Sequence, residues 1–379
     1  MYNSSICFKW RASFVSLLQV TIYHQQVALE CILIAMVQTT EVSGKPYIHD
    51  YGARLSEGVS YLKESQTLIW VDIFLSEIHL VTNIDDPKSS HKVVKINYEN
   101  YIGEYPCDKD LPERVGVVFP VDSASGVKDI FFASKYGIGR LSLETAQWKY
   151  EVLFSSCEQT KNKDWKRLRS NDGNVAPNGD LYVGVMLDFH IDMDRSAEPE
   201  GCFLRVDLKK RAVELVMDGL HIPNAINWNP KKDTIFLTDS LNYKIWTAPY
   251  DSHSGLPALA QKKSFIEFKP LNSECSDPEP DGSCIDPRNG NLYSAVFSSH
   301  KVQLFDSQGT LQRNLVFPDT ANVTCCCLGP GGDLFVTTAS RDVLHGVKTS
   351  GPNGALFRVA ADLVSDSGDV PSSKPNPAF

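Results

Sequence analysis

The stretch NGDLYVG, at residues 178–184, joins a tight turn to a short apolar strand. Asn, Gly and Asp suit the turn because they tolerate positive φ, and Leu-Tyr-Val favours an extended strand. A second strand-like run, CFLRV at 202–206, follows after a polar loop. The segment therefore predicts two neighbouring strands that are joined by a loop.

The same arrangement of turn, strand, loop and second strand occurs six times along the chain. The five other first strands are TLIWVD at 67–72, IFFAS at 130–134, TIFLTD at 234–239, NLYSA at 291–295 and DLFVT at 333–337. Their spacing, about 40 to 60 residues, is close to the period of propeller blades. No long stretch has the period of an amphipathic helix. We therefore predict an all-β fold, a six-bladed β-propeller with four strands in each blade.

The two ends of the chain differ in composition from its body. Residues 1–35 contain two apolar runs that polar side chains interrupt, and neither run reaches the roughly 18 residues of a membrane span. The last residues are rich in Ser, Pro and Asp. We expect an unassigned extension over 1–35, untranslated or disordered, the propeller over 36–364, and a disordered tail over 365–379.

Charge and cysteine content exclude some classes of function. The net charge of −9 argues against nucleic-acid binding, which needs a basic surface. The ten cysteines show no zinc-finger spacing, and free thiols are typical of a reducing compartment. We expect a cytoplasmic protein without a membrane partner, with secretion as the alternative, because residues before the first apolar run weakly resemble a signal peptide.

A group of polar residues, RSNDG at 169–173, lies shortly before the 178–184 turn. By itself the group also suits a plain hairpin turn. However, Glu57, Asn171, Asn224 and Asp281 all lie nine or ten residues before the first strand of their repeats. Equivalent positions in different blades lie at one height around the channel, so we expect these four side chains to meet.

Two carboxylates and one or two amide oxygens form a hard oxygen site, which suits calcium, magnesium or manganese, with zinc as an alternative. The competing interpretation makes Glu57 a solvated loop acid and Pro280-Asp281-Gly282 a turn. The shared offset favours the metal site.

Four further polar residues are secondary candidates. Asp72 and Asp239 fall at strand ends, where we expect structural roles. Asp188 and His190 follow the third repeat's strand, where they would line the mouth of a substrate site. A surface position for His190 is the alternative.

These motifs together resemble the SMP-30/gluconolactonase/regucalcin-like family of lactonases. The resemblance runs from about Tyr51 to Val359. It rests on six motifs in order: SEG at 56–58, LIWVDI at 68–73, RSNDG at 169–173, PN at 223–224, TDS at 238–240 and PDGSCID at 280–286.

The resemblance implies a six-bladed propeller with one catalytic divalent cation in its channel. It implies that Glu57, Asn224 and Asp281 are metal ligands. Asn171 would be a further ligand or a substrate contact, and Arg169 a substrate contact. The expected cation is calcium, with zinc, manganese or magnesium as alternatives.

The function that follows is a metal-dependent hydrolase that opens a small cyclic ester, here a sugar lactone, with Asp281 as general base. One alternative is an esterase or phosphotriesterase on the same scaffold, and another is a non-catalytic metal-binding propeller.

The chain departs from the family pattern at Val59, Tyr61 and Ala225, where the family has Pro, Trp and Gly. These departures affect the shape of the loops more than metal ligation.

Overall fold

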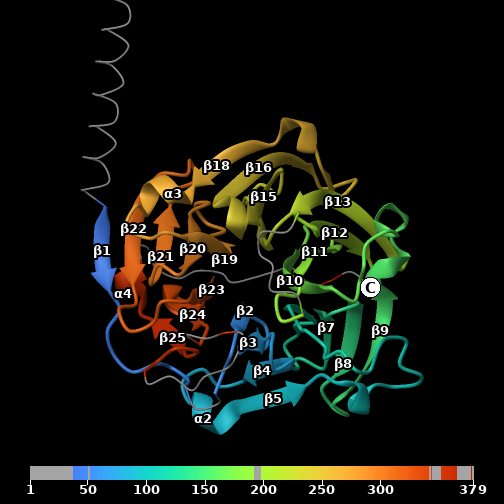
Figure 1. Ribbon diagram of the computed structural model, residues 1–379. Coiled ribbons are helices and arrows are strands. Elements are labelled where there is room, and N and C mark those ends of the chain that lie inside the picture. The colour runs from blue at the N-terminus through green and yellow to red at the C-terminus, as the bar shows by residue number, and fades with distance from the viewer. Residues whose placement is uncertain are drawn as a thin grey trace, which may run out of the picture.

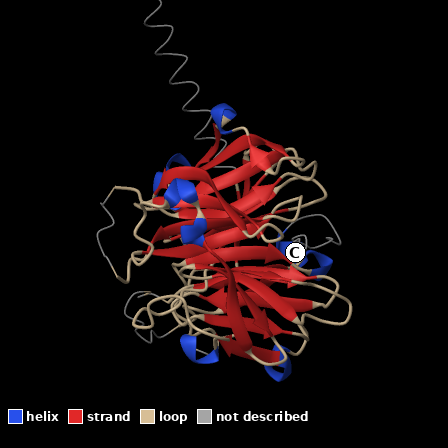
Figure 2. Cartoon of the chain, turned by 90° about the vertical axis from the view of Figure 1, so that its right-hand side faces the viewer, coloured by secondary structure: helices blue, strands red, loops and turns tan. Residues whose placement is uncertain are grey.

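A computed structural model describes residues 37–49, 52–191, 198–340, 343, 351–364 and 377. Six small, mainly antiparallel sheets stand in a ring around a common axis (Figure 1). Seen from the side, strands make up almost the whole body (Figure 2). The fold is a six-bladed β-propeller, which confirms the fold class predicted from the repeats.

Each blade begins with its innermost strand, next to the channel, and continues outward in chain order. Blade one has β2 (Ser56–Leu62), β3 (Thr67–Asp72), β4 (Glu77–Val81) and β5 (His91–Lys95), and blade two has β6 (Val117–Pro120), β7 (Asp129–Ala133), β8 (Gly137–Ser142) and β9 (Gln147–Leu153). Blade three has β10 (Leu168–Val175), β11 (Leu181–Leu187), β12 (Gly201–Asp207) and β13 (Ala212–Leu220), and blade four has β14 (Pro223–Trp228), β15 (Thr234–Asp239), β16 (Lys244–Asp251), β17 (Leu256–Pro257) and β18 (Lys263–Glu267). Blade five has β19 (Glu279–Ile285), β20 (Leu292–Phe297), β21 (Lys301–Phe305) and β22 (Leu311–Val316), and blade six has β23 (Val323–Leu328), β24 (Leu334–Thr338) and β25 (Leu356–Val359).

Helices contribute little to the described fold. Three single-turn helices, α2 (Pro87–Ser90), α3 (Phe268–Leu271) and α4 (Ala361–Val364), lie in connections or after the last strand. No helix in the described ranges is long and apolar enough to cross a bilayer.

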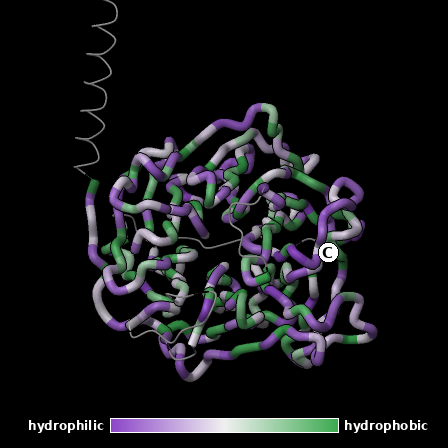
Figure 3. Tube along the Cα trace, in the orientation of Figure 1, coloured by the Kyte–Doolittle hydropathy of each residue, from purple (hydrophilic) through white to green (hydrophobic). Residues whose placement is uncertain are grey.

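The hydrophobic core lies between neighbouring blades. Val117 of β6 and Val183 of β11, for example, are fully buried in one cluster that joins blades two and three. Hydrophobic and hydrophilic residues are interspersed along the chain around the whole ring (Figure 3). Several strands, among them β2, β3 and β11, are buried along their whole length. Burying each large apolar side chain contributes about 1.5–3 kcal/mol. This packing fixes the six inner strands relative to one another.

The N-terminal segment joins two blades. Strand β1 (Gln38–Glu41) pairs in parallel with β22, so blade five has five strands. Ile48 then forms an antiparallel bridge with Leu356 of β25, beside the three described strands of blade six. The expectation of four strands in every blade is therefore wrong for blade five, and also for blade four, where β17 and β18 both pair with β16. Blade six has three strands among the described residues. The predicted extension over 1–35 lies outside the described residues, as does almost all of the predicted tail, so both stay predictions.

The inner strands of five blades are interrupted near their starts. The pairing shifts after Glu57 in β2, after Ser170 in β10, after Pro223 in β14, after Pro280 in β19 and after Val323 in β23. Such bulges insert extra residues and redirect side chains. In β2 the bulge includes Gly58, whose φ of +60° favours glycine. The bulges therefore place one segment of each inner strand at the same end of the channel.

Candidate metal and substrate site

The residues at four of these bulges, in β2, β10, β14 and β19, line one cavity of about 500 Å³. Glu57, Asn171, Asn224 and Asp281 come from blades one, three, four and five, and Arg169 of β10 lies beside them. All five side chains are largely buried. The structure thus brings together the five residues that the family resemblance named as metal ligands or substrate contacts, which we call the polar floor of the cavity.

One side of the polar floor of the cavity carries the two carboxylates of Glu57 and Asp281 and the amide of Asn224. Asn224 Nδ2 donates a hydrogen bond to Asp281 Oδ1 and another, of 3.1 Å, to Ser240 Oγ. The backbone N–H of Gly58 donates to Glu57 Oε2 at 3.0 Å. Asn224 Oδ1 is buried without a hydrogen-bond partner in the described part of the chain. Buried polar atoms normally have partners, so this oxygen fits an additional ligand.

The electrostatics of the two carboxyl groups also fit a cation. Burial raises the pKa of Glu57, and the negative charge of Asp172 raises it further. Burial raises the pKa of Asp281 well above its usual range, and the charge of Glu57 adds to this effect. The described residues contain no group of three His, Cys, Asp or Glu side chains that would hold a metal. A site here therefore needs the amide oxygen of Asn224 as well as the two carboxylates.

These pKa shifts predict how pH affects the metal-free protein. The folded-state pKa of each carboxyl group is raised. At pH values above the usual pKa of a carboxyl group, the folded chain therefore binds more protons than the unfolded chain. Their contribution to stability is present at low pH and is lost as pH rises through the raised pKa values. We expect the chelator-treated protein to be less stable at about pH 8 than at about pH 5, and calcium to remove the difference.

Urea unfolding at the two pH values, with chelator and with calcium, measures this effect. The Glu57→Gln/Asp281→Asn double variant lacks both carboxyl groups and should show a flatter pH dependence without metal. Equal stability of the metal-free parent at both pH values would contradict the electrostatic description of the pair.

Arg169 and Asn171 lie on the adjacent side of the polar floor and are joined by a hydrogen bond. Arg169 Nη1 donates to Asn171 Oδ1 at 2.8 Å and to the Ser170 carbonyl at 2.9 Å. Asn171 Nδ2 donates to the Pro223 carbonyl at 3.2 Å. The amide oxygen of Asn171 thus already accepts from a cation, which favours a role in substrate contact over metal ligation. Arg169 Nε is buried and makes no hydrogen bond within the described residues.

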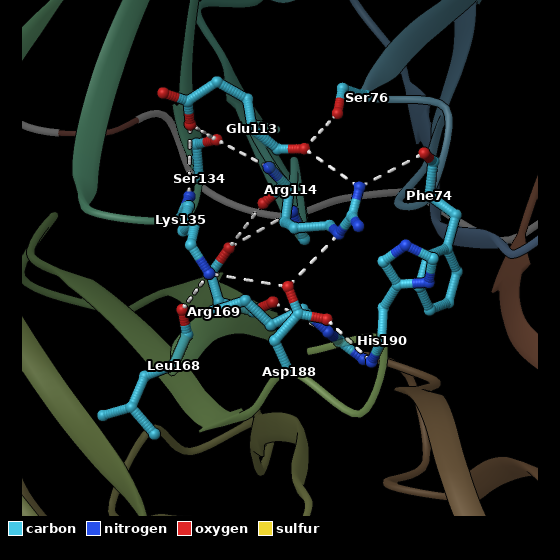
Figure 4. Close-up of polar contacts among 12 residues, drawn as sticks. Phe74, Ser76, Glu113, Arg114, Ser134, Lys135, Leu168, Arg169, Asp188 and His190 are labelled. Atoms are coloured by element: carbon cyan, nitrogen blue, oxygen red, sulfur yellow. Dashed lines mark hydrogen bonds and ion pairs between the residues drawn. The ribbon is translucent and has the colours of Figure 1, made fainter. Parts of the chain in front are cut away.

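Arg169 lies next to a group of buried charged side chains (Figure 4). Asp188 Oδ2 is 3.3 Å from Arg114 Nε and 3.5 Å from Lys135 Nζ, and Lys135 also donates to the Leu168 carbonyl at 3.0 Å. Burial lowers the pKa of Arg169, and the charge of Asp188 is the largest influence opposing that shift. We call Arg114, Lys135, Arg169 and Asp188 the charge cluster.

The expected place of Asp188 and His190 in the substrate mouth is wrong. Asp188 is fully buried in the charge cluster, and neither residue lines the cavity. Asp188 is buried because two cations from blade two converge on it. His190 is exposed, and its ring meets the edge of Phe74 at 5.9 Å between centroids.

Asp72 and Asp239 hold the backbone that enters the inner strands. Asp72 accepts from the backbone N–H of Arg54 at 2.6 Å, and Asp239 accepts from that of Ile222 at 3.0 Å. They perform the same task in blades one and four, as their equal positions at strand ends suggested. The sequence analysis did not select Arg114, Lys135 or Ser240. Of these, Ser240 had a signal, because it lies in the TDS motif at 238–240.

Comparison with known proteins places this arrangement in a family. Residues 55–340 match the SMP-30/gluconolactonase/LRE-like region. The chain belongs to this family. The matched region contains the five residues of the polar floor, Glu57, Arg169, Asn171, Asn224 and Asp281.

Two relatives and one solved structure illustrate the similarity. The uncharacterised protein YBR053C of Saccharomyces cerevisiae is 41% identical over 88% of this chain and 95% of its own length. A Bacillus subtilis protein provisionally named sugar lactone lactonase YvrE is 25% identical over 81% of this chain and 91% of its own. A calcium-binding regucalcin from Agrobacterium tumefaciens has a TM-score of 0.71 at 20% identity, over 91% of this chain and all of its own. The last of these shows a shared fold.

Proposed function

We propose that this protein is a metal-dependent hydrolase that opens the ring of a small lactone. The observation that carries the proposal is the convergence of Glu57, Asp281 and the unpartnered Asn224 Oδ1 in one cavity. Membership of a family described by gluconolactonase, and similarity to a protein named as a sugar lactone lactonase, support lactone hydrolysis. The sugar lactone predicted from the sequence remains a prediction.

The residues of the cavity have complementary roles in this proposal. Glu57, Asn224 and Asp281 would hold a divalent cation, and all-oxygen ligands favour calcium, with magnesium, manganese or zinc as alternatives. Such a cation, when bound, supplies Lewis-acid polarisation of the lactone carbonyl. Asp281 would accept a proton from the attacking water, a contribution of about 10²–10⁴ in rate. Arg169 would position the substrate.

Two other functions remain to be separated by experiment. An esterase or phosphotriesterase would use the same cavity floor with a different substrate. A non-catalytic propeller would use the cation only as a structural ligand. The buried Arg169 beside the carboxylates disfavours the latter, because a structural metal site needs no cation next to it.

The direct test uses the full chain, stripped of metal with a chelator and then supplied with each divalent ion. A panel of lactones, aryl esters and phosphotriesters is assayed under each condition. The proposal predicts lactone hydrolysis that depends on a divalent cation. Metal-independent activity, or metal binding without hydrolysis of any substrate in the panel, contradicts it.

Arg169→Ala should mainly raise KM, while the affinity for the cation stays nearly unchanged. A guanidinium donates hydrogen bonds and does not ligate cations, so its loss affects the substrate. Steady-state kinetics and calorimetric metal titration measure the two effects. Arg140→Ala, which removes a half-exposed arginine of blade two, is the matched control. Loss of metal affinity with an unchanged KM would refute the role given to Arg169.

A further inference from the structure

The wall of the cavity above its polar floor is mostly apolar, although Glu279, Ser298 and Asn322 also line the cavity. Seven apolar side chains line it, from the segments that enter or leave β2, β3, β11, β14, β20 and β24. They are Leu55, Phe74, Met186, Phe189, Ile222, Phe297 and Val343. We call this set the apolar collar. It comes from blades one, three, five and six and from the approach to blade four, so it surrounds the floor.

The aromatic members of the collar differ in how much of each ring is exposed. The Phe74 ring centroid lies 4.8 Å from the guanidinium carbon of Arg54 and 5.0 Å from that of Arg114. These cation–π contacts fix its position. Phe189 and Phe297 are half-buried, so part of each ring remains accessible. Large apolar side chains usually become buried, so accessible rings in a concave site favour an apolar ligand.

Several polar groups of the cavity are already engaged by the protein. Asn171 uses its amide oxygen for Arg169 and its amide nitrogen for the Pro223 carbonyl. Ser240 donates to the Pro280 carbonyl at 2.7 Å, and Asn322 Nδ2 donates to the Ser340 carbonyl at 3.0 Å. A substrate with many hydroxyl groups would have to place some of them against the collar, where they lose water without gaining hydrogen bonds.

We propose that the substrate is a lactone bearing an apolar substituent, not a polyhydroxylated sugar lactone. This inference rests on the proposed lactonase function. The ester group lies at the polar floor, and the substituent lies against the apolar collar. In the reaction, water adds across the acyl C–O bond. The carbonyl carbon gains the water's hydroxyl, the ring oxygen gains a proton, and the product is an apolar hydroxy acid.

The test compares two lactones of equal ring size with the metal-loaded full-length protein: δ-nonalactone, with a four-carbon chain, and glucono-δ-lactone. We expect kcat/KM to be at least tenfold higher for δ-nonalactone and to rise with chain length, because each added methylene in an apolar pocket contributes roughly tenfold. A preference for glucono-δ-lactone overturns the inference but leaves the proposed function intact. Hydrolysis of neither lactone with any divalent ion overturns both.

Variants of the two half-buried rings locate the specificity. Phe189→Ala and Phe297→Ala should each lower kcat/KM for δ-nonalactone about tenfold and leave that for glucono-δ-lactone within about twofold. Phe265→Ala, in the outer strand β18 and in edge contact with Phe236, is the matched control for loss of a half-buried phenylalanine. Equal losses for both lactones in the collar variants, with the fold retained by circular dichroism, would overturn the assignment of the collar.

Discussion

Glu57→Gln and Asp281→Asn should each remove most of the divalent-cation binding and most of the hydrolysis. Each change leaves the size of the side chain almost unaltered but removes one of the two charges that would balance the cation. For Asp281→Asn, loss of the general base alone corresponds to about 10²–10⁴ in kcat. Calorimetric titration with calcium and assays at saturating metal measure the two effects separately.

Suitable controls carry the same chemical change at the surface. Glu267→Gln, at the end of β18, removes the ion-pair partner of Lys244, and Asp251→Asn changes the turn after β16. Both should bind calcium and turn over substrate like the parent. If Glu57→Gln and Asp281→Asn bind calcium as tightly as these controls, the metal site lies elsewhere.

Asp188→Asn should lower the free energy of unfolding by about 3–5 kcal/mol, as expected when one member of a buried ion pair is removed. Three buried cations would then share one neutral amide within the charge cluster. Asp129→Asn is the matched control, because it breaks an ion pair with Arg140 that is about one-third exposed. That control should lose no more than about 1 kcal/mol.

Chemical denaturation of both variants, with metal removed, isolates this effect from ligand binding. Arg169 should also become more mobile in the Asp188 variant, so KM should rise in the metal-loaded enzyme. A loss in Asp188→Asn no larger than in Asp129→Asn would show that the charge cluster does not depend on its carboxylate.

The repeats and the shared offset were sufficient to predict the blades and the convergence of the floor residues. The same pattern of turn and strand occurs in every blade, so positions such as Glu57 and Asn224 could be aligned from the sequence alone. The bulges that aim these residues into the channel carry a weaker signal. Gly58 and Gly282 hint at them, but the register shifts depend on pairing with the next strand.

Contacts between blades could not be predicted in the same way. Asp188 looked like a mouth residue because it follows a strand, and its burial depends on Arg114 and Lys135 in the preceding blade. Likewise, the sequence of β1 does not specify its partner strand, and its parallel pairing with β22 follows from tertiary packing. The apolar collar combines single residues from separate connections, so no continuous motif reveals it.

The distribution of the ligands over blades that are far apart in the sequence affects how this site is assembled during folding. Glu57 lies in the first blade and Asp281 in the fifth, and blade six, beside Ile48, lies between them around the ring. A partly folded chain with several native blades would therefore have no complete set of ligands. Calcium affinity should appear only when the two ends of the chain have met, so it reports the closure of the ring as well as the chemistry of the site.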